Sequence, residues 1–513
     1  MSRNKLIAGT VTLTFANLIT KFLGFYYRVY MSDAIGSEGM GLYQLILPIY
    51  ALTWSITASG FTTTVSRLTA RENAKGETGN IGRIVKQSLL MCFIASILLS
   101  VCLMGFSDFI ALHILKESRT LLSLRLLAFS IPFMAVGSCL RGFFMGLQNM
   151  TVPALSQIIE QVVRIGSIFL IAGTFVPKGL SYACFAAVWG IVLGEGISFF
   201  FSLCSYILFK RKRNFTKKPT TKSYAITIMI LSMALPLSAT RITASLLSAA
   251  ENILIPRQLQ FFGYSSADAL ELYGELTGMA MPLLQLPSAF LMAASASLIP
   301  EISEACAVGQ NNRISRTISA SLLFTFIIGI GASCFFSVFP KEICYVIYSK
   351  SDLGSLLFPL AFFCPLLYGH TTLSGLLNGL GEQFFLFCIH LLSSIITIGF
   401  ILLLVPEYGI AAYFVGWFLS LLITTVLSLQ RLKKRTQVHF SFLQCMTKPL
   451  MAGIAAAFLT KYIIQIGTPS KSLFFISFCV MGILYLLFLL ILGCFSKDIW
   501  KIILPKKFLH KEK

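Results

Sequence analysis

The feature that most constrains this chain is a series of long apolar stretches separated by short polar segments. About 20 predominantly apolar residues are needed for a helix to cross the roughly 30 Å hydrocarbon core of a bilayer. Only helices and closed barrels satisfy their backbone groups there, and these stretches lack the period-2 alternation of barrel strands. About fourteen transmembrane helices are predicted, at residues 6–31, 42–62, 86–106, 121–145, 152–176, 181–208, 224–250, 275–298, 317–339, 355–378, 383–405, 411–430, 446–466 and 472–494.

The charge content supports a membrane protein and argues against a soluble or a nucleic-acid-binding one. Only 12% of residues are charged and 56% are hydrophobic, whereas soluble domains carry about 25% charged residues. The net charge of +21 does not indicate a nucleic-acid partner, because the basic residues lie in short loops between apolar stretches. The 13 cysteines are scattered and form no CxxC motif, so neither a disulfide framework nor a metal site is expected.

The loop charges predict the orientation. Basic residues gather in alternate loops, and the intervening loops carry few of them, which places the basic loops in the cytoplasm. The chain is therefore expected to be a multi-pass protein of a bacterial plasma membrane, with both termini cytoplasmic. The basic loops and ends contain Arg3/Lys5, Arg67/Arg71/Lys75/Arg83, Lys210–Arg213 with Lys217/Lys218, Arg313/Arg316, Arg431/Lys433/Lys434/Arg435 and the tail 497–513.

An internal repeat adds a second constraint. Under an offset of 233 residues Gly76 falls on Gly309, and residues 76–147 match 309–380 without a gap. About one position in three is identical, against roughly one in ten expected from composition. The third predicted helix falls on the ninth, so each half holds six helices and both halves share one orientation. Two such lobes around a central site are typical of alternating-access transporters.

The predicted fold is thus an all-α integral membrane protein with two parallel six-helix lobes and two further C-terminal helices. The N-terminal lobe is expected at 1–210, a basic cytoplasmic linker at 211–222 and the C-terminal lobe at 223–435. Two extra transmembrane helices occupy 436–496, and a basic cytoplasmic tail follows at 497–513.

Three cations lie inside predicted spans, where ionisable residues are costly and usually functional. Lys21 and Arg28 lie in the first helix, with Lys21 too deep to reach the cytoplasmic surface easily; Arg28 has snorkelling as an equal alternative. Arg241 lies in the seventh helix, where Thr240-Arg241 resembles Thr20-Lys21. We expect these cations to line a central cavity. Such a cavity suits an anionic headgroup, with phosphate the obvious candidate.

A second group of polar residues is a candidate gate or coupling site. Glu160 and Arg164 are spaced i, i+4, which predicts an ion pair on one helix face, and a purely structural pair is an equal alternative. Glu195, and Glu251 with Asn252, are candidate counter-charges or coupling-ion ligands. No catalytic residue and no cofactor is expected. The energy source would be a coupling ion or the membrane potential, which favours outward movement of two negative charges by roughly 4–5 kcal/mol per 100 mV.

Three N-terminal segments resemble a known family. Leu18–Arg28 (LITKFLGFYYR) followed by Ile35–Tyr43 (IGSEGMGLY), and the stretch Gly60–Gly76, are similar to the N-terminus of the stage V sporulation protein B family. That family belongs to the polysaccharide transporter group of the multidrug/oligosaccharidyl-lipid/polysaccharide flippase superfamily.

This resemblance implies a substrate and a role for the cations. It implies a flippase that moves an undecaprenyl-diphosphate-linked saccharide such as lipid II to the outer leaflet, for spore cortex peptidoglycan or another cell-wall polysaccharide. Basic residues of a central cavity would hold the diphosphate, a role that falls on Lys21, Arg28 and Arg241. The expected partners are the lipid-linked glycan, membrane lipids and cell-wall synthesis proteins.

Two other functions remain open at this point. A multidrug or cation antiporter of the same fold would need an acidic site, for which the three glutamates of the second group are candidates. A membrane enzyme such as a glycan polymerase would need catalytic residues in large outer loops. The longest outer loop, roughly 251–274, leads to Asp268, Glu271 and Glu275 but to no recognisable catalytic set, so an enzyme is not expected.

Overall fold

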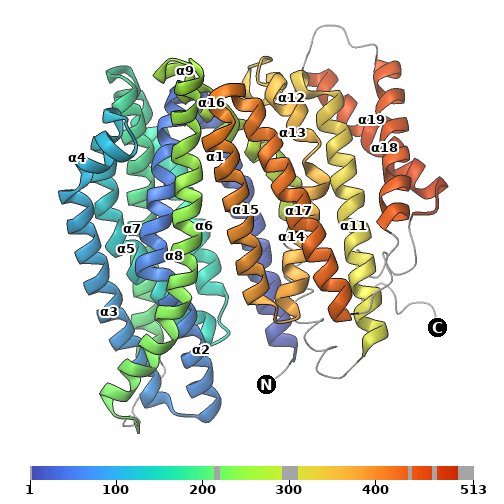
Figure 1. Cartoon of the computed structure of the whole chain (residues 1–513). Helices are drawn as coiled ribbons and strands as arrows, with labels where there is room; N and C mark the ends of the chain where they lie inside the picture. The colour runs from blue at the N-terminus through green and yellow to red at the C-terminus, as the bar shows by residue number, and fades with distance from the viewer. Residues whose placement is uncertain (1–2, 213–219, 292–309, 437–441, 465–470, 495–513) are drawn as a thin grey trace. The chain divides into compact units, whose positions relative to one another are not determined.

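The computed structural model describes residues 3–212, 220–291, 310–436, 442–464 and 471–494. Within these ranges every regular element is a helix (Figure 1), which confirms the predicted all-α membrane fold. Nine described helices are long and apolar enough to cross a membrane, or ten if the bent pair α13 and α14 forms one span. The count of fourteen stays a prediction, because parts of the spans expected at 275–298 and 446–466 lie outside the described residues.

The described chain divides into two compact units, Met1–Gly278 and Met279–Lys513. The lobe boundary expected at 211–222 concerns the sequence repeat and stays a prediction; residues 213–219 and the tail 497–513 lie outside the described residues. The elements of the first unit are α1 (Arg3–Trp54), η1 (Ser55–Ser59), α2 (Gly60–Lys75), α3 (Thr78–Gly105), α4 (Ser107–Phe109), η2 (Ile110–Ile114), η3 (Ser118–Thr120), α5 (Leu121–Gly146), α6 (Thr151–Phe175), η4 (Val176–Lys178), α7 (Leu180–Lys212), α8 (Ser223–Phe262) and α9 (Ser266–Gly274).

The turn η5 (Glu275–Ala280) bridges the two units in sequence. The remaining helices of the second unit are α11 (Asn311–Val338), α12 (Pro340–Tyr348), α13 (Gly354–Ala361), α14 (Cys364–Gly379), α15 (Gln383–Leu403), α16 (Val405–Tyr408), α17 (Ile410–Thr436), α18 (Phe442–Ile464) and α19 (Lys471–Ile491).

The first helix, α1, joins two predicted spans into one element. Residues 32–41, expected as a loop, are helical on both sides of Gly36, whose φ of +71° interrupts the helix. Glycine adopts this left-handed conformation without the steric cost that a side chain would add. The chain therefore changes direction at a single residue, and no loop separates the two halves of α1.

The 233-residue offset relates helix boundaries as well as residue types. α11 begins and ends at the positions equivalent to those of α3, and α13 with α14 covers the positions of α5. Left-handed backbone recurs at Lys116 and Ser349, and again at Gln148 and Gly381. The sequence repeat is thus also a repeat of structure over these helices.

Small residues bring the helices of the first unit together. A Cβ on Gly142 of α5 would lie 2.5 Å from the carbonyl oxygen of Thr62, and one on Gly146 would lie 2.5 Å from that of Ser66, both on α2. No hydrophobic force draws helices together in lipid, so close backbone approach at glycine supplies the packing.

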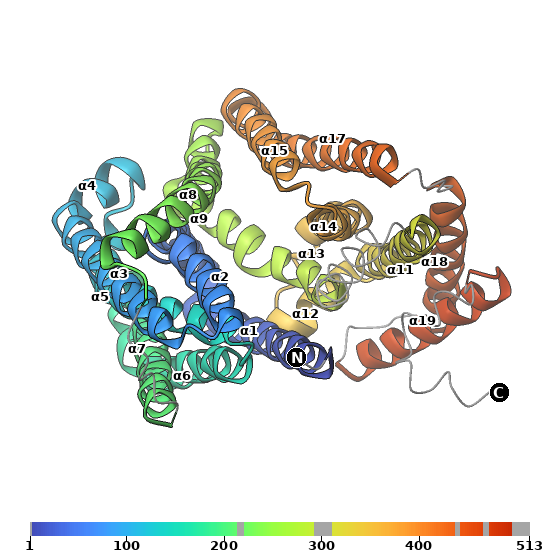
Figure 2. The same ribbon diagram turned by 90° about the horizontal axis from the view of Figure 1, so that it is seen from below.

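The second unit shows the same kind of packing. The Tyr485 hydroxyl of α19 donates to the carbonyl of Ile327 on α11 at 2.8 Å, and a Cβ on Gly453 of α18 would lie 2.6 Å from the Cys334 sulfur. Viewed from below, α15 and α17 lie side by side, as do α18 and α19 (Figure 2).

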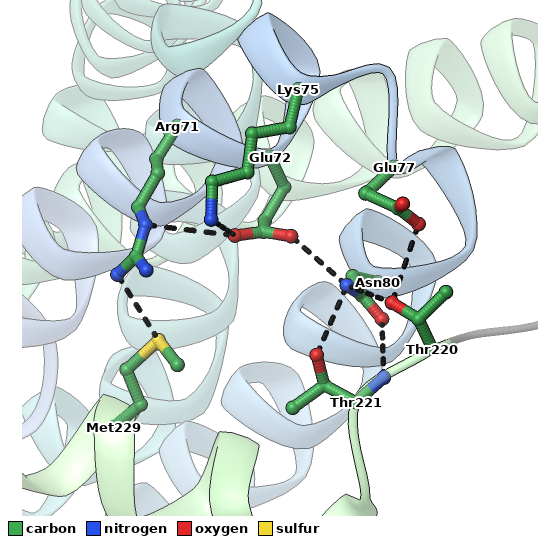
Figure 3. A network of polar contacts seen from close by, with 8 residues as sticks. All are labelled: Arg71, Glu72, Lys75, Glu77, Asn80, Thr220, Thr221 and Met229. Carbon is green, nitrogen blue, oxygen red and sulfur yellow. Dashed lines mark hydrogen bonds and ion pairs between the residues drawn. The ribbon is translucent and has the colours of Figure 1, made fainter.

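A polar clasp fixes the chain that leads into α8, at the end of the first unit where the loop charges predict cytoplasm (Figure 3). The Asn80 amide of α3 donates to Glu72 at 2.9 Å and to the hydroxyls of Thr220 and Thr221 at 3.0 and 3.2 Å. Its oxygen accepts from the Thr221 backbone at 3.2 Å, and Arg83 donates to the Thr221 carbonyl at 2.6 Å. The described end of the predicted linker is thereby tied to α2 and α3.

Candidate functional site

The first half of α1 carries two of the predicted headgroup cations. Lys21 and Arg28 are both half-buried, and α1 lies against α6 near them, since a Cβ on Gly24 would approach the Gln161 amide to 2.9 Å. The Arg28 guanidinium donates from Nη1 to the carbonyl of Thr277 at 3.4 Å. Arg28 therefore reaches a backbone acceptor in the protein, which simple snorkelling to lipid headgroups does not require.

The third predicted cation, Arg241 on α8, lies in a different setting. Its side chain is exposed, and its guanidinium carbon lies 5.4 Å from the ring centroid of Trp54 at the end of α1. This distance is typical of a cation–π contact. The hypothesis that Arg241 faces Lys21 across a cleft stays a prediction.

The ion pair expected on α6 is present. Arg164 Nη2 lies 2.7 Å from Glu160 Oε1, and both side chains are largely buried, with 16% and 17% exposed. Two glycines of α7 make room for this pair: a Cβ on Gly194 would lie 2.9 Å from the Glu160 carbonyl, and one on Gly190 would lie 3.1 Å from the Arg164 carbonyl. The geometry fits a structural pair and a gate equally well.

Glu195 of α7 is buried beside this pair. One carboxylate oxygen accepts a hydrogen bond from the Tyr50 hydroxyl of α1, and Oε2 has no hydrogen-bond partner among the described residues. The Nε of Arg164 is also buried and without a described partner. Because a buried carboxylate oxygen without a donor is costly, this oxygen is a place where a proton or another cation would be stabilised.

Two residues of this cluster are not identifiable as functional candidates from the sequence. Tyr50 carries no signal of its own, because its partner lies 145 positions away. Arg141 lies near the end of the span predicted at 121–145, and its guanidinium donates to Ser138 at 2.7 Å and to Ser198 at 3.1 Å. Arg141 also lies within electrostatic range of Glu195. The serines are the signal that could have drawn attention to it.

The last pair of candidates lies on α8. The Asn252 amide donates to the Ser248 carbonyl at 2.7 Å, and its oxygen accepts from the Tyr273 hydroxyl of α9 at 3.0 Å. Glu251 is half-buried. Asn252 therefore links α8 to α9, and the structure does not place it in contact with the Glu160–Arg164 pair. Within the described residues, no group of three His, Cys, Asp or Glu side chains is arranged to hold a metal ion.

Comparison with known proteins then decides the family. Residues 6–306, more than half of the chain, match the family model described as "Polysaccharide biosynthesis protein". The chain belongs to the polysaccharide biosynthesis protein family. It is 30% identical over 418 residues to "Stage V sporulation protein B" of Bacillus subtilis (strain 168), covering 80% of each protein. The resemblance noted in the first helix is thereby confirmed.

Other similar proteins are named as flippases or transporters. It is 28% identical over 207 residues to "Lipid II flippase MurJ" of the same organism, covering 36% of this chain and 37% of the relative. Among solved structures it is similar to "Lipid II flippase MurJ, inward closed conformation", with a TM-score of 0.71 at 15% identity over 94% of this chain and 98% of that one. An inward-facing multidrug resistance MATE transporter matches with a TM-score of 0.68 at 14% identity, over 83% and 98%. The fold is that of these transporters, and the apolar helices make the chain a multi-pass membrane protein.

Proposed function

We propose that this protein is a flippase that moves an undecaprenyl-diphosphate-linked saccharide, such as lipid II, from the inner to the outer leaflet by alternating access. Lys21 carries the proposal: it is a half-buried cation inside the predicted span 6–31, on a helix long and apolar enough to cross a membrane. A cation inside a span is costly, so its presence there indicates a functional role. Arg28 lies seven residues further along the same helix and adds a second cation.

The relatives support both the substrate class and the biological setting. One relative is named a lipid II flippase and another a stage V sporulation protein, which favours export of a cell-wall precursor and a role in spore cortex synthesis. The proposal includes both termini in the cytoplasm of a bacterial cell, as the loop charges indicate. It also includes the protein's action as a carrier that performs no covalent chemistry on its substrate.

The driving force in this proposal is electrical, with Glu195 as a coupling group. Outward movement of a diphosphate through a potential that is negative inside releases roughly 4–5 kcal/mol per 100 mV for two charges. The buried Glu195 oxygen without a described donor offers a site for a coupling proton or cation. Lys21, Arg28 and Arg241 serve the headgroup; Glu160, Arg164, Glu251 and Asn252 are the remaining candidates for a gate.

The same buried carboxylate favours one alternative, a multidrug or cation antiporter. An antiporter would carry a cationic compound and would depend on Glu195 but not on Lys21. Transport of a cationic dye by the wild-type protein, unaffected by neutralising Lys21, would select this alternative.

The proposal is tested by flipping of labelled lipid II in proteoliposomes that contain the purified full chain. We expect Lys21→Gln to lower the initial rate by at least tenfold, the effect of losing about 1.4 kcal/mol from one charged contact, and Lys21→Arg to keep most of it. Arg125→Gln is the matched control, since this exposed arginine of α5 pairs with Asp108 at 2.9 Å. Equal rates in Lys21→Gln and wild type would refute the cationic site, and the absence of flipping by wild type would refute the substrate.

A further inference from the structure

The part of α1 that follows Gly36 crosses α9 at two glycines. A Cβ on Gly41 would lie 2.1 Å from the carbonyl oxygen of Leu270, and a Cβ on Gly274 would lie 2.1 Å from the carbonyl oxygen of Ser37. Side-chain carbons do not approach a carbonyl oxygen so closely. The two backbones therefore touch only because both positions are glycine.

The two sides of this crossing are related by the repeat. Three pairs of residues at the crossing are each separated by 233 positions: Ser37 and Leu270, Gly41 and Gly274, and Gln44 and Thr277. Gly41 lies against Leu270, and Gly274 lies against Ser37, which is the position equivalent to Leu270 in the first repeat. The same contact is therefore made twice with the two repeats exchanged, which is the pattern of an isologous contact about a two-fold axis. In a transporter with parallel repeats, the helices beside this axis must part for access from one side.

The carbonyl of Thr277 is the polar lock of the crossing. It lies in the π-helical turn η5, and π-turns are frequent at functional sites. It accepts one hydrogen bond from the side-chain amide of Gln44 at 3.3 Å and another from the guanidinium of Arg28 at 3.4 Å. Both bonds are long, and a phosphate oxygen binds a guanidinium more strongly than a neutral carbonyl does.

The part of α1 that follows Gly36, called the outer segment here, has its own polar contacts, separate from those of the part that carries Arg28. Glu38 accepts a hydrogen bond from Arg119 at 2.7 Å, and Arg119 also donates two hydrogen bonds to Glu117, at 2.7 and 2.9 Å. Gly36, between Arg28 and Glu38, gives the backbone a point at which the two segments can turn independently. A change at Arg28 can thus reach the crossing through Thr277 without displacing the outer segment.

We propose that the Gly41–Gly274 crossing is the extracytoplasmic gate of this transporter and that Arg28 is its substrate sensor. In the closed gate Arg28 donates to the Thr277 carbonyl. When the headgroup arrives, the guanidinium turns to the diphosphate oxygens. The bonds that remain, from Gln44 to Thr277, from Ser37 to Glu275 at 3.2 Å and from Tyr273 to the Gln44 carbonyl at 3.5 Å, then no longer hold the crossing. Without substrate, the hydrogen bond from Arg28 to Thr277 stays formed and the gate stays closed. This inference rests on the proposed function for the identity of the headgroup and for the side of the membrane.

The test reads gate opening directly at Met40. This side chain is fully buried and lies against Gly278, whose Cβ would approach the Met40 methyl carbon to 2.9 Å. In the variant Met40→Cys, reconstituted in nanodiscs, labelling by a hydrophilic thiol reagent requires the crossing to part. Peptide mass spectrometry measures the label at position 40, so the native cysteines stay in place.

We expect slow labelling of ligand-free Met40→Cys and an increase of about tenfold when Arg28→Leu is added, since one hydrogen bond from a charged group is lost. Lipid II should raise labelling of Met40→Cys by a similar factor and should have no further effect with Arg28→Leu. Arg125→Leu is the matched control, because it removes an exposed cation whose partner is Asp108 at 2.9 Å: ligand-free labelling should stay slow. Gln44→Leu, which removes the second donor, should also raise ligand-free labelling.

The outcomes separate this inference from the proposed function. If Arg28→Leu and Gln44→Leu leave ligand-free labelling slow, the lock is refuted, even where lipid II is flipped normally. If both variants raise ligand-free labelling while lipid II has no effect on any variant, the lock stands and the proposed substrate is refuted.

Discussion

The hydroxyl oxygens of Thr325 on α11 and Thr372 on α14 lie 2.7 Å apart, and the equivalent positions of the first repeat are Cys92 and Cys139. The two cysteines also contact each other through their side chains, and all four residues are buried. The same helix crossing is therefore closed by a pair of hydroxyls in one repeat and by a pair of thiols in the other.

This relationship predicts different costs for single and double substitutions. Thr325→Val should destabilise the protein by about 0.6 kcal/mol and by no more than about 1.7 kcal/mol, the average and the maximum for side-chain hydrogen bonds between membrane helices, because the Thr372 hydroxyl loses its partner. The double variant Thr325→Val/Thr372→Val should cost less than the sum of the singles. Thermal unfolding of the purified variants measures the coupling, and strictly additive losses would show that the hydroxyl pair contributes nothing.

The glycine crossing predicts that a single methyl group blocks closure. Gly41→Ala places a carbon 2.1 Å from the Leu270 carbonyl oxygen, so the two backbones must separate. We expect flipping to fall at least tenfold, the consequence of a loss near 1.4 kcal/mol, because the gate no longer closes. Gly166→Ala is the control, since nothing lies within 4 Å of its added Cβ. Equal activity of the two variants would contradict a tight crossing.

The contact between Tyr50 and Glu195 separates a structural from a coupling role. Tyr50→Phe removes the hydrogen-bond donor that the structure gives Glu195 and should destabilise the protein by about 1–3 kcal/mol. Glu195→Gln keeps an acceptor for Tyr50 but cannot bind or release a proton. We expect it to unfold near the wild-type temperature and to lose any response of flipping to a pH gradient. A response equal to wild type would remove Glu195 from coupling.

A pH-dependent clamp is predicted at Glu382, between α14 and α15. Arg431 donates to Oε2 at 2.8 and 3.1 Å and Arg435 donates to the other oxygen. The hydrogen bonds from Arg431 foremost, and those from Arg435, hold the pKa of Glu382 below its usual value. A lowered folded-state pKa means that the carboxylate stabilises the fold above the unfolded pKa of about 4.3 and loses this effect as the pH falls through the folded pKa.

The check compares Glu382→Gln with wild type by thermal unfolding across the acid range. The variant should be less stable by up to about 1 kcal/mol at neutral pH, as expected for a partly exposed ion pair, and the difference should vanish below the folded pKa. Glu407→Gln, an exposed carboxylate on α16, should show no such pH dependence. A difference that is constant with pH would contradict the clamp.

Features that depend on local spacing were predictable from the sequence. The i, i+4 spacing of Glu160 and Arg164 fixed their ion pair, and the 233-residue offset gave matching bounds for α3 and α11. The break of α1 was predictable only in part, because a short polar stretch looks like a loop. Whether residues 32–41 form a loop or a helix with one left-handed glycine depends on what packs against them, here α9.

The functional contacts that could not be predicted from the sequence join residues that lie far apart along the chain. Nothing around Tyr50 indicates that its hydroxyl meets Glu195, and the Thr277 carbonyl is a backbone group that carries no sequence signal at all. Arg28 was predicted to bind headgroups, but its partner in this structure is that carbonyl. Side-chain chemistry can be inferred from the sequence, whereas the pairing of groups across helices follows from tertiary packing.

The membrane potential supplies the final prediction. If the cargo crosses with about two negative charges, an inside-negative potential of 100 mV favours outward over inward flipping by roughly 4–5 kcal/mol. In proteoliposomes with a potassium-diffusion potential, lipid II should therefore accumulate in the outer leaflet and should redistribute when the potential is reversed. Lys21→Gln should slow the approach to the same final distribution, because a carrier changes rates and not the equilibrium set by the potential. A final distribution that ignores the sign of the potential would mean that the cargo crosses with its charge neutralised, for instance by a co-transported cation bound at Glu195.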